Sequence, residues 1–168
     1  MQNQTPLQAM SAWFETQPKE VQNQAGFLIY TGIAELIGDK EFRFDKDPGE
    51  AFLAWLKDTP SGSLVALSKT LLARHHIEFT MINGFCTQES WDRARANNEA
   101  ALEAARTEER FASIGETAQQ MLDDIPRRQA VYMKAAQEWK ESIAPVVSDE
   151  AIRRWHDATL FANTRKAG

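Results

Sequence analysis

The chain has 168 residues, of which 43% are hydrophobic and 26% are charged, and its formal net charge is −5 at pH 7. These values are typical of a globular protein, and five Trp with nine Phe exclude a chain that is disordered throughout. A single Cys cannot form an internal disulfide, which indicates a reducing compartment, and the N-terminus lacks the pattern of a signal peptide. We therefore expect a cytoplasmic protein.

The first 63 residues carry several helix signals. Thr5 and Pro6 predict the N-cap and the first position of a helix. Residues 47–50, Asp-Pro-Gly-Glu, predict a capping box that opens a short helix, and residues 59–63, TPSGS, predict the loop after it. The least helical part of the chain is the segment DKEFRFDKDPGE, residues 39–50.

The most apolar stretch covers residues 25–38 and contains Glu35. A helix that crosses a bilayer needs about 20 apolar residues, so we expect no membrane span. The stretch belongs instead to a buried helix that begins at Pro18 and ends at Gly38. Its expected core face comprises Val21, Ala25, Leu28, Gly32 and Leu36.

A further helix is predicted from Leu64 to about Ile82. At about 100° per residue, its apolar stripe also includes polar side chains. The expected core face comprises Leu64, Leu71, His75, Glu78 and Ile82. His76 is rotated off this face, so the two adjacent histidines cannot serve one site. Cys86 lies beyond the helix end and is interpreted as a small buried hydrophobic residue.

Glu35, His75 and Glu78 form the candidate ligand pocket. Carboxylates and an imidazole that face the interior of a helical bundle are the side chains that bind metal ions in such bundles. A buried carboxylate also needs a partner, because burying it unpaired is costly. The paired Glu-x-x-His motifs of di-iron bundles, HExxH and a zinc-binding set of cysteines are all absent. We therefore predict no metal and no cofactor, and favour a structural His75 that is hydrogen-bonded to Glu35 or Glu78.

An alanine-rich helix is predicted to begin after the N-cap Thr87 and to reach Asp124, which is longer than most globular helices. Its apolar stripe is interrupted by the polar residues 107–110, TEER, where the helix bends or changes its neighbour. Ile125 and Pro126 predict its end, because the residue before a proline avoids the helical region.

Two shorter helices follow, one with Tyr132 on its apolar face and one capped by Ser148. The predicted fold class is all-α, a bundle of about six or seven helices with a long, coiled-coil-like antiparallel pair in its C-terminal half. We expect a single helical domain over residues 1–168, with possible sub-units 1–86 and 87–168.

The charge is distributed unevenly, since residues 126–168 hold eight Lys and Arg against five Asp and Glu. Two Arg pairs near helix starts form a candidate partner surface for phosphate or carboxylate groups. These residues are Arg127, Arg128, Arg153 and Arg154. Salt-bridged helix surface is the alternative. We do not expect a nucleic-acid partner, because the chain as a whole is acidic and affinity for nucleic acid depends on neutralising phosphates.

The sequence contains no P-loop, dinucleotide-binding glycine pattern, G-x-S-x-G elbow or kinase motif. It therefore does not favour an enzyme, and we assign no catalytic residue. We predict a non-catalytic accessory protein that acts through contacts with a protein partner, self-association included. One alternative is a small helical protein or enzyme that binds a ligand or metal at Glu35, His75 and Glu78. A further alternative is a phasin-like protein that coats a surface.

Overall fold

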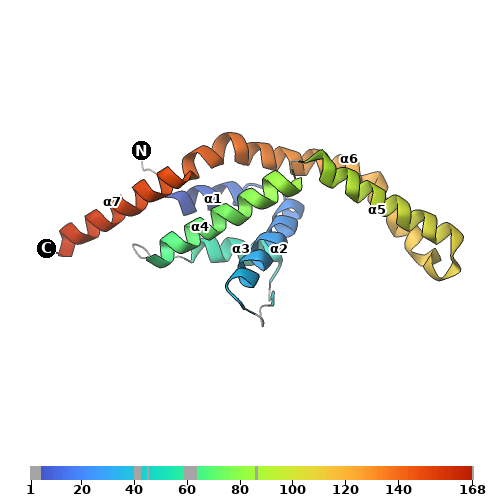
Figure 1. Ribbon diagram of the computed structural model, residues 1–168, viewed down its shortest axis with the longest axis horizontal. Coiled ribbons are helices and arrows are strands. Elements are labelled where there is room, and N and C mark those ends of the chain that lie inside the picture. Colours follow the sequence, from blue (N-terminus) through green and yellow to red (C-terminus); the bar gives the residue numbers. More distant parts are fainter. Residues whose placement is uncertain (1–4, 40–42, 45, 59–63, 86, 168) are drawn as a thin grey trace. The chain divides into compact units, whose positions relative to one another are not determined.

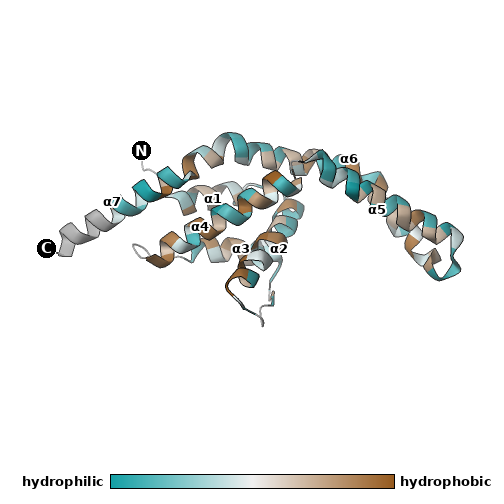
Figure 2. Cartoon of the chain, in the orientation of Figure 1, coloured by the Kyte–Doolittle hydropathy of each residue, from teal (hydrophilic) through white to brown (hydrophobic). Residues whose placement is uncertain are grey.

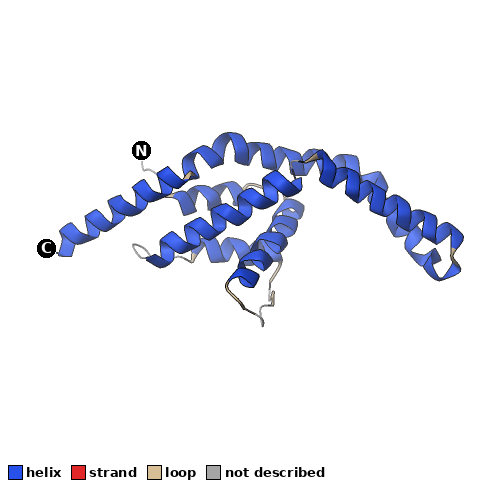
Figure 3. Ribbon diagram, in the orientation of Figure 1, coloured by secondary structure: helices blue, strands red, loops and turns tan. Residues whose placement is uncertain are grey.

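A computed structural model describes residues 5–39, 43–44, 46–58, 64–85 and 87–167. Every regular element among these residues is a helix, as Figure 3 shows. The predicted all-α fold class is thus confirmed.

The helices carry the labels of Figure 1. The α-helices of the described residues are α1 (Pro6–Glu15), α2 (Lys19–Leu36), α3 (Pro48–Lys57), α4 (Leu64–Phe79), α5 (Gln88–Thr107), α6 (Gly115–Glu138) and α7 (Asp149–Ala167). Shorter segments are the π-helical η1 (Thr80–Phe85) and η3 (Trp139–Ile143), and the 3₁₀-helical η2 (Glu109–Ile114) and η4 (Ala144–Val147).

The chain divides into two compact units. One comprises residues 1–80 and 137–168, and the other comprises residues 81–136. The predicted sub-units, residues 1–86 and 87–168, instead placed the C-terminal segment 137–168 with the second half of the chain. The difference arises because the C-terminal segment contacts α1 and α4 and therefore belongs with the N-terminal helices.

Aromatic side chains fill the core of the first unit. Trp13 of α1 packs against Trp139 of η3 with ring centroids 5.1 Å apart, and the edge of Phe14 meets Phe52 of α3 at 5.2 Å. Other side chains that are almost completely buried in this unit are Met10, Val21, Ile29, Ile33, Leu56, Ile77 and Ile152. The core thus joins residues from both ends of the chain.

Two glycines bring α2 and the start of α3 into very close contact. A Cβ atom on Gly26 would lie 2.6 Å from the carbonyl oxygen of Pro48, and one on Gly49 would lie 2.8 Å from the Cβ of Gln22. No larger residue fits at this distance without a shift of the backbone. The contact therefore determines which side of α2 faces the core.

The buried face of α2 differs in part from the predicted one. Val21 and Ala25 are buried as expected, but Leu28 and Leu36 are exposed. Ile29 and Ile33 take their places in the core. Because residues 25–37 are apolar on several sides of the helix, their pattern alone could not determine its rotation, which depends on the contact at Gly26.

The second unit contains an antiparallel hairpin of α5 and α6. At one end Gln129 Nε2 donates a hydrogen bond to Gln88 Oε1, 3.0 Å away. At the other end, a Cβ atom on Gly115 would lie 3.0 Å from the Cβ of Ala105. Figure 1 shows the two helices side by side, which agrees with the predicted antiparallel pair.

The turn of this hairpin lies earlier than predicted. Helix α5 ends at Thr107, Glu108 adopts an extended conformation, and the chain reverses through η2. The polar TEER segment therefore ends the helix, and the expected continuous helix to Asp124 is wrong. The break expected at Pro126 is also wrong, because Pro126 lies inside α6. An internal proline costs about 3 kcal/mol in a helix, and here Ile125 and Tyr132 on either side of it are buried.

Most of the predicted caps are present. The side chain of Thr5 accepts a hydrogen bond from the Gln8 backbone, Thr87 accepts one from Ser90, and Ser148 accepts one from Ala151. Gly38 follows α2 with a φ of +77°, a conformation that favours glycine. The capping box expected at residues 47–50 is wrong, because Asp47 makes no side-chain bond to the start of α3.

Candidate functional site

The predicted ligand residues do not converge. His75 and Glu35 are exposed, and Glu78 is half-buried beside Arg74 at 3.6 Å. The prediction that all three face the core is therefore wrong. Among the described residues, no group of three His, Cys, Asp or Glu side chains is placed to hold a metal ion. Cys86 lies outside the described residues.

The histidine that touches α2 is His76, which the helical wheel placed away from the core. A Cβ atom on Gly32 would lie 3.0 Å from His76 Nδ1. His76 Nε2 is buried without a hydrogen-bond partner among the described atoms. Burial lowers the pKa of His76 below its ordinary value, and the neighbouring His75 lowers it further. This arrangement favours the neutral imidazole.

Helix α4 has two apolar faces. The buried face, which lies against the first unit, consists mainly of small residues: Ala66, Thr70, Ala73 and Ile77. The opposite face carries Leu64, Leu71 and Phe79, whose exposed fractions are 73%, 37% and 60%. In Figure 2, brown hydrophobic segments alternate with teal hydrophilic ones along this helix.

The exposed face of α4 forms a regular stripe. Its positions are Leu64, Ser68, Leu71, His75 and Phe79, which recur at intervals of three or four residues and are all exposed. Residues at this spacing lie on one side of a helix. We call these five residues the α4 stripe. It coincides in large part with the face that the sequence predicted to be buried.

Charged groups beside the α4 stripe are engaged within the chain. Arg74 forms ion pairs with Glu78 and with Asp149 of α7. Lys69 donates a hydrogen bond of 2.6 Å to the carbonyl oxygen of Asp58, and its ammonium lies 4.9 Å from the ring centre of Trp55. None of the five residues of the stripe is itself Asp, Glu, Lys or Arg.

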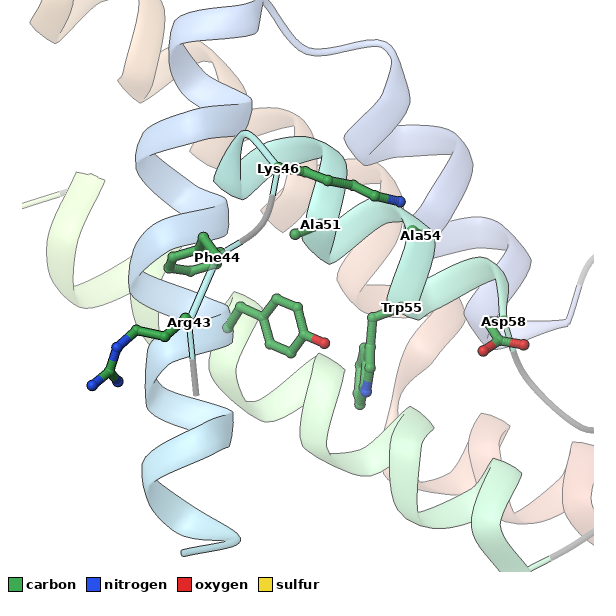
Figure 4. A pocket seen from close by; sticks show the side chains of 8 residues that line it. Arg43, Phe44, Lys46, Ala51, Ala54, Trp55 and Asp58 are labelled. Atoms are coloured by element: carbon green, nitrogen blue, oxygen red, sulfur yellow. The ribbon is translucent and has the colours of Figure 1, made fainter. Parts of the chain in front are cut away.

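A second feature of the first unit is a hollow of about 270 Å³ beside Tyr30 and Trp55. Ala51 and Ala54 of α3 leave space on one side of it, and Phe44 adds a further aromatic wall. Figure 4 shows Lys46 extended above the two alanines and Arg43 directed away. A neighbouring hollow of about 240 Å³ shares Tyr30 and Trp55. Sequence analysis missed this site, whose only signal was the Ala51–Ala54 spacing on an aromatic helix.

The four predicted partner-surface arginines do not form one cluster within a single unit. Arg127 makes two bonds to Asp124, at 2.7 and 2.9 Å, and this contact lowers the pKa of Asp124. Arg128 lies 5.4 Å from the ring centre of Tyr132. These two belong to the second unit, whereas Arg153 and Arg154 lie in the first, where Arg154 pairs with Glu150 at 2.8 Å. Salt-bridged helix surface accounts for most of these contacts.

Comparison with protein-family models, with curated proteins and with solved structures gives no match to this chain. Within the described residues, no helix combines the length and the apolar character that a bilayer crossing requires. The α4 stripe and the hollow are therefore the two candidate sites of this chain.

Proposed function

We propose that this chain is a non-catalytic interaction protein that binds a protein partner through the α4 stripe. The observation that supports the proposal is that α4 buries Ala66, Thr70 and Ala73, with Ile77 as its one large buried residue, and exposes Leu64, Leu71 and Phe79. A helix that only needed to complete its own core would place its large apolar residues inside.

Burial of the α4 stripe by a partner would be favourable in free energy. Removing apolar surface from water contributes roughly 25 cal/mol per Å². Leu64, Leu71 and Phe79 lie along about four turns of one helix, so a partner helix can contact all three at once. Such contacts are typical of helix-in-groove and helix-pair recognition. None of the five stripe positions is Asp, Glu, Lys or Arg, so a partner that covers the stripe need not bury the charge of such a residue.

The proposal is tested by affinity purification from the native host with tagged wild-type protein and a tagged Leu71→Glu variant. A glutamate there places a charge in the middle of the stripe, so we expect the captured proteins to be lost. The matched control is Val146→Glu, which makes the same change at an exposed apolar residue of η4. If Leu71→Glu captures the same proteins in the same amounts as wild type, the α4 stripe is not the binding surface.

The hollow beside Tyr30 and Trp55 supports a second candidate function, the binding of a small aromatic anion. The rings of Tyr30 and Trp55 line the hollow, and the ammonium of Lys46 at the rim suits a carboxylate. Indole-3-carboxylate is a suitable probe, with the indole N–H signal of Trp55 followed by NMR. We expect Ala54→Leu, which fills the hollow, to remove the response. An unchanged response in that variant would exclude this site.

A further inference from the structure

We infer that the partner of the α4 stripe is the same stripe of a second copy, with the two α4 helices antiparallel. This inference rests on the proposed function and adds the identity and orientation of the partner. It follows from a property of the stripe that is independent of its hydrophobicity, namely the order of its polar and apolar positions.

The order of residues in the stripe is self-complementary when the helix is reversed. A two-fold axis between positions 71 and 72 places Leu64 of one copy opposite Phe79 of the other. The same axis places Ser68 opposite His75, and Leu71 beside its own counterpart. Every apolar position then meets an apolar one and every polar position meets a polar one. An in-register parallel pair also matches apolar with apolar positions, and it differs in placing Ser68 opposite Ser68 and His75 opposite His75.

The polar positions gain partners in this arrangement. Within the described residues of one chain, neither the Ser68 hydroxyl nor the His75 imidazole makes a side-chain hydrogen bond, and both side chains are exposed. Across the axis the hydroxyl can donate to an imidazole nitrogen, and this occurs twice by symmetry. Because a buried polar group without a partner is costly, these two bonds favour the antiparallel register over neighbouring ones.

Charge also favours a second copy at this surface. The chain carries a net charge of −5, so most faces of two copies repel each other. The stripe lacks acidic and basic residues, and Lys69 and Arg74 beside it already have partners within the chain. On one side of the stripe the exposed Val65 and the half-buried Leu72 extend the apolar surface. Two copies can therefore meet here without opposing like charges.

The expected dimer is weak. Helix α4 has 16 residues and is about 24 Å long, so one pair of helices lies at the small end of specific interfaces, which bury about 1,200–2,000 Å². The measurement must therefore reach high protein concentration. Sedimentation equilibrium of the full chain between about 5 and 300 µM covers the range of dissociation constants expected of small interfaces.

Two double variants that share His75→Glu and differ only at position 68 test the register. In Ser68→Lys/His75→Glu, an antiparallel dimer places Lys opposite Glu at both sites, so we expect a dissociation constant within about threefold of wild type. In Ser68→Glu/His75→Glu it places Glu opposite Glu, and we expect dimerisation to weaken by at least about tenfold. Positions 68 and 75 are too far apart on one helix to interact, so we expect the two variants to differ little in the stability of the monomer. Circular dichroism checks that both fold.

Each other outcome overturns the inference. A dimer that is lost in Ser68→Lys/His75→Glu, where a parallel pair would oppose Lys with Lys and Glu with Glu, excludes the antiparallel arrangement. A dimer that persists in Ser68→Glu/His75→Glu uses another surface. A wild-type chain that is monomeric at about 300 µM has no such dimer. The proposed function fails separately, if Leu71→Glu and wild type capture the same host proteins.

Discussion

The core around α1, α2 and α3 and the helix α4 use large and small residues in opposite ways. In the core, Phe14 and Phe52 are buried, and glycines lie where two backbones approach each other. In α4 the small residues are buried, while Leu64 and Phe79 are exposed. The size of an apolar residue therefore does not determine which face of a helix is buried. Small residues can also be the contact face, because they permit close approach of helices.

We expect the greatest difference in the free energy of unfolding between alanine substitutions of two phenylalanines of the first unit. We expect Phe52→Ala to lower the free energy of unfolding by about 3–5 kcal/mol, because it opens a cavity in the core. Phe79→Ala on the α4 stripe should change it by less than about 0.5 kcal/mol. Urea denaturation at low micromolar concentration, where a weak dimer is dissociated, measures both. Equal losses would contradict the exposure of the stripe.

The glycine contact between α2 and α3 provides the next contrast. A methyl group on Gly26 meets the backbone of Pro48 at 2.6 Å, so we expect Gly26→Ala to lower the free energy of unfolding by about 2–3 kcal/mol. Gly84 has no neighbouring atom within 4 Å of such a methyl group. Gly84→Ala should therefore be neutral or stabilising by up to about 1 kcal/mol, because alanine favours a helix. Thermal melting of both variants makes the comparison.

The two faces of α4 can be compared directly by enlarging one residue on each. Ala73 is completely buried, so we expect Ala73→Leu to lower the free energy of unfolding by about 1–2 kcal/mol as neighbouring side chains shift. Ser68→Leu on the exposed stripe should leave it unchanged within about 0.5 kcal/mol. Denaturant unfolding measures both values. A larger loss for Ser68→Leu would mean that the faces are assigned the wrong way round.

The smallest expected effect is a dependence of stability on pH that comes from His76. Burial lowers its pKa in the folded chain below the ordinary value of 6.5, so near and below that pH the unfolded chain binds more protons. The contribution of neutral His76 is therefore complete above about pH 6.5 and is lost as the pH falls towards the folded pKa. His76→Gln should reduce the slope of stability against pH as the pH falls below about 6.5.

The exposed His75 provides the control for this measurement. The variant His75→Gln should retain more of the slope than His76→Gln, because His75 lies on the solvent side of α4 and does not contact Gly32. Chemical denaturation at a series of pH values gives the slope for each variant. A slope that His76→Gln leaves unchanged would mean that the pKa of His76 does not differ between the folded and unfolded chains.

Local signals in the sequence predicted much of the helical structure. Thr5, Thr87 and Ser148 cap helices as expected, and Gly38 follows the end of α2. Each signal depends on bonds between residues that are close in the chain, and such bonds do not require knowledge of the tertiary structure. Asp47 is the exception, since it precedes α3 without capping it through its side chain.

The candidate site could not be predicted in the same way. The wheel correctly grouped Leu64, Leu71 and His75 on one side of α4, but it assigned that side to the core. Periodicity reports which residues share a face and not which face is covered. A helix with apolar residues on two sides is therefore ambiguous. The hollow beside Trp55 was missed for a related reason, because it is formed by residues from three separate segments.

Caps and periodicity in the sequence were enough to predict that the chain is helical, where most of its helices begin, and that Leu64, Leu71 and His75 share a side of α4. The rotation of α2 and α4, the position of the α5–α6 turn and the placement of α7 with the N-terminal helices became known only from the folded structure. The physical reason is that capping and periodicity are local, whereas the burial of a face depends on contacts such as that of Gly26 with Pro48, which join segments far apart in the chain.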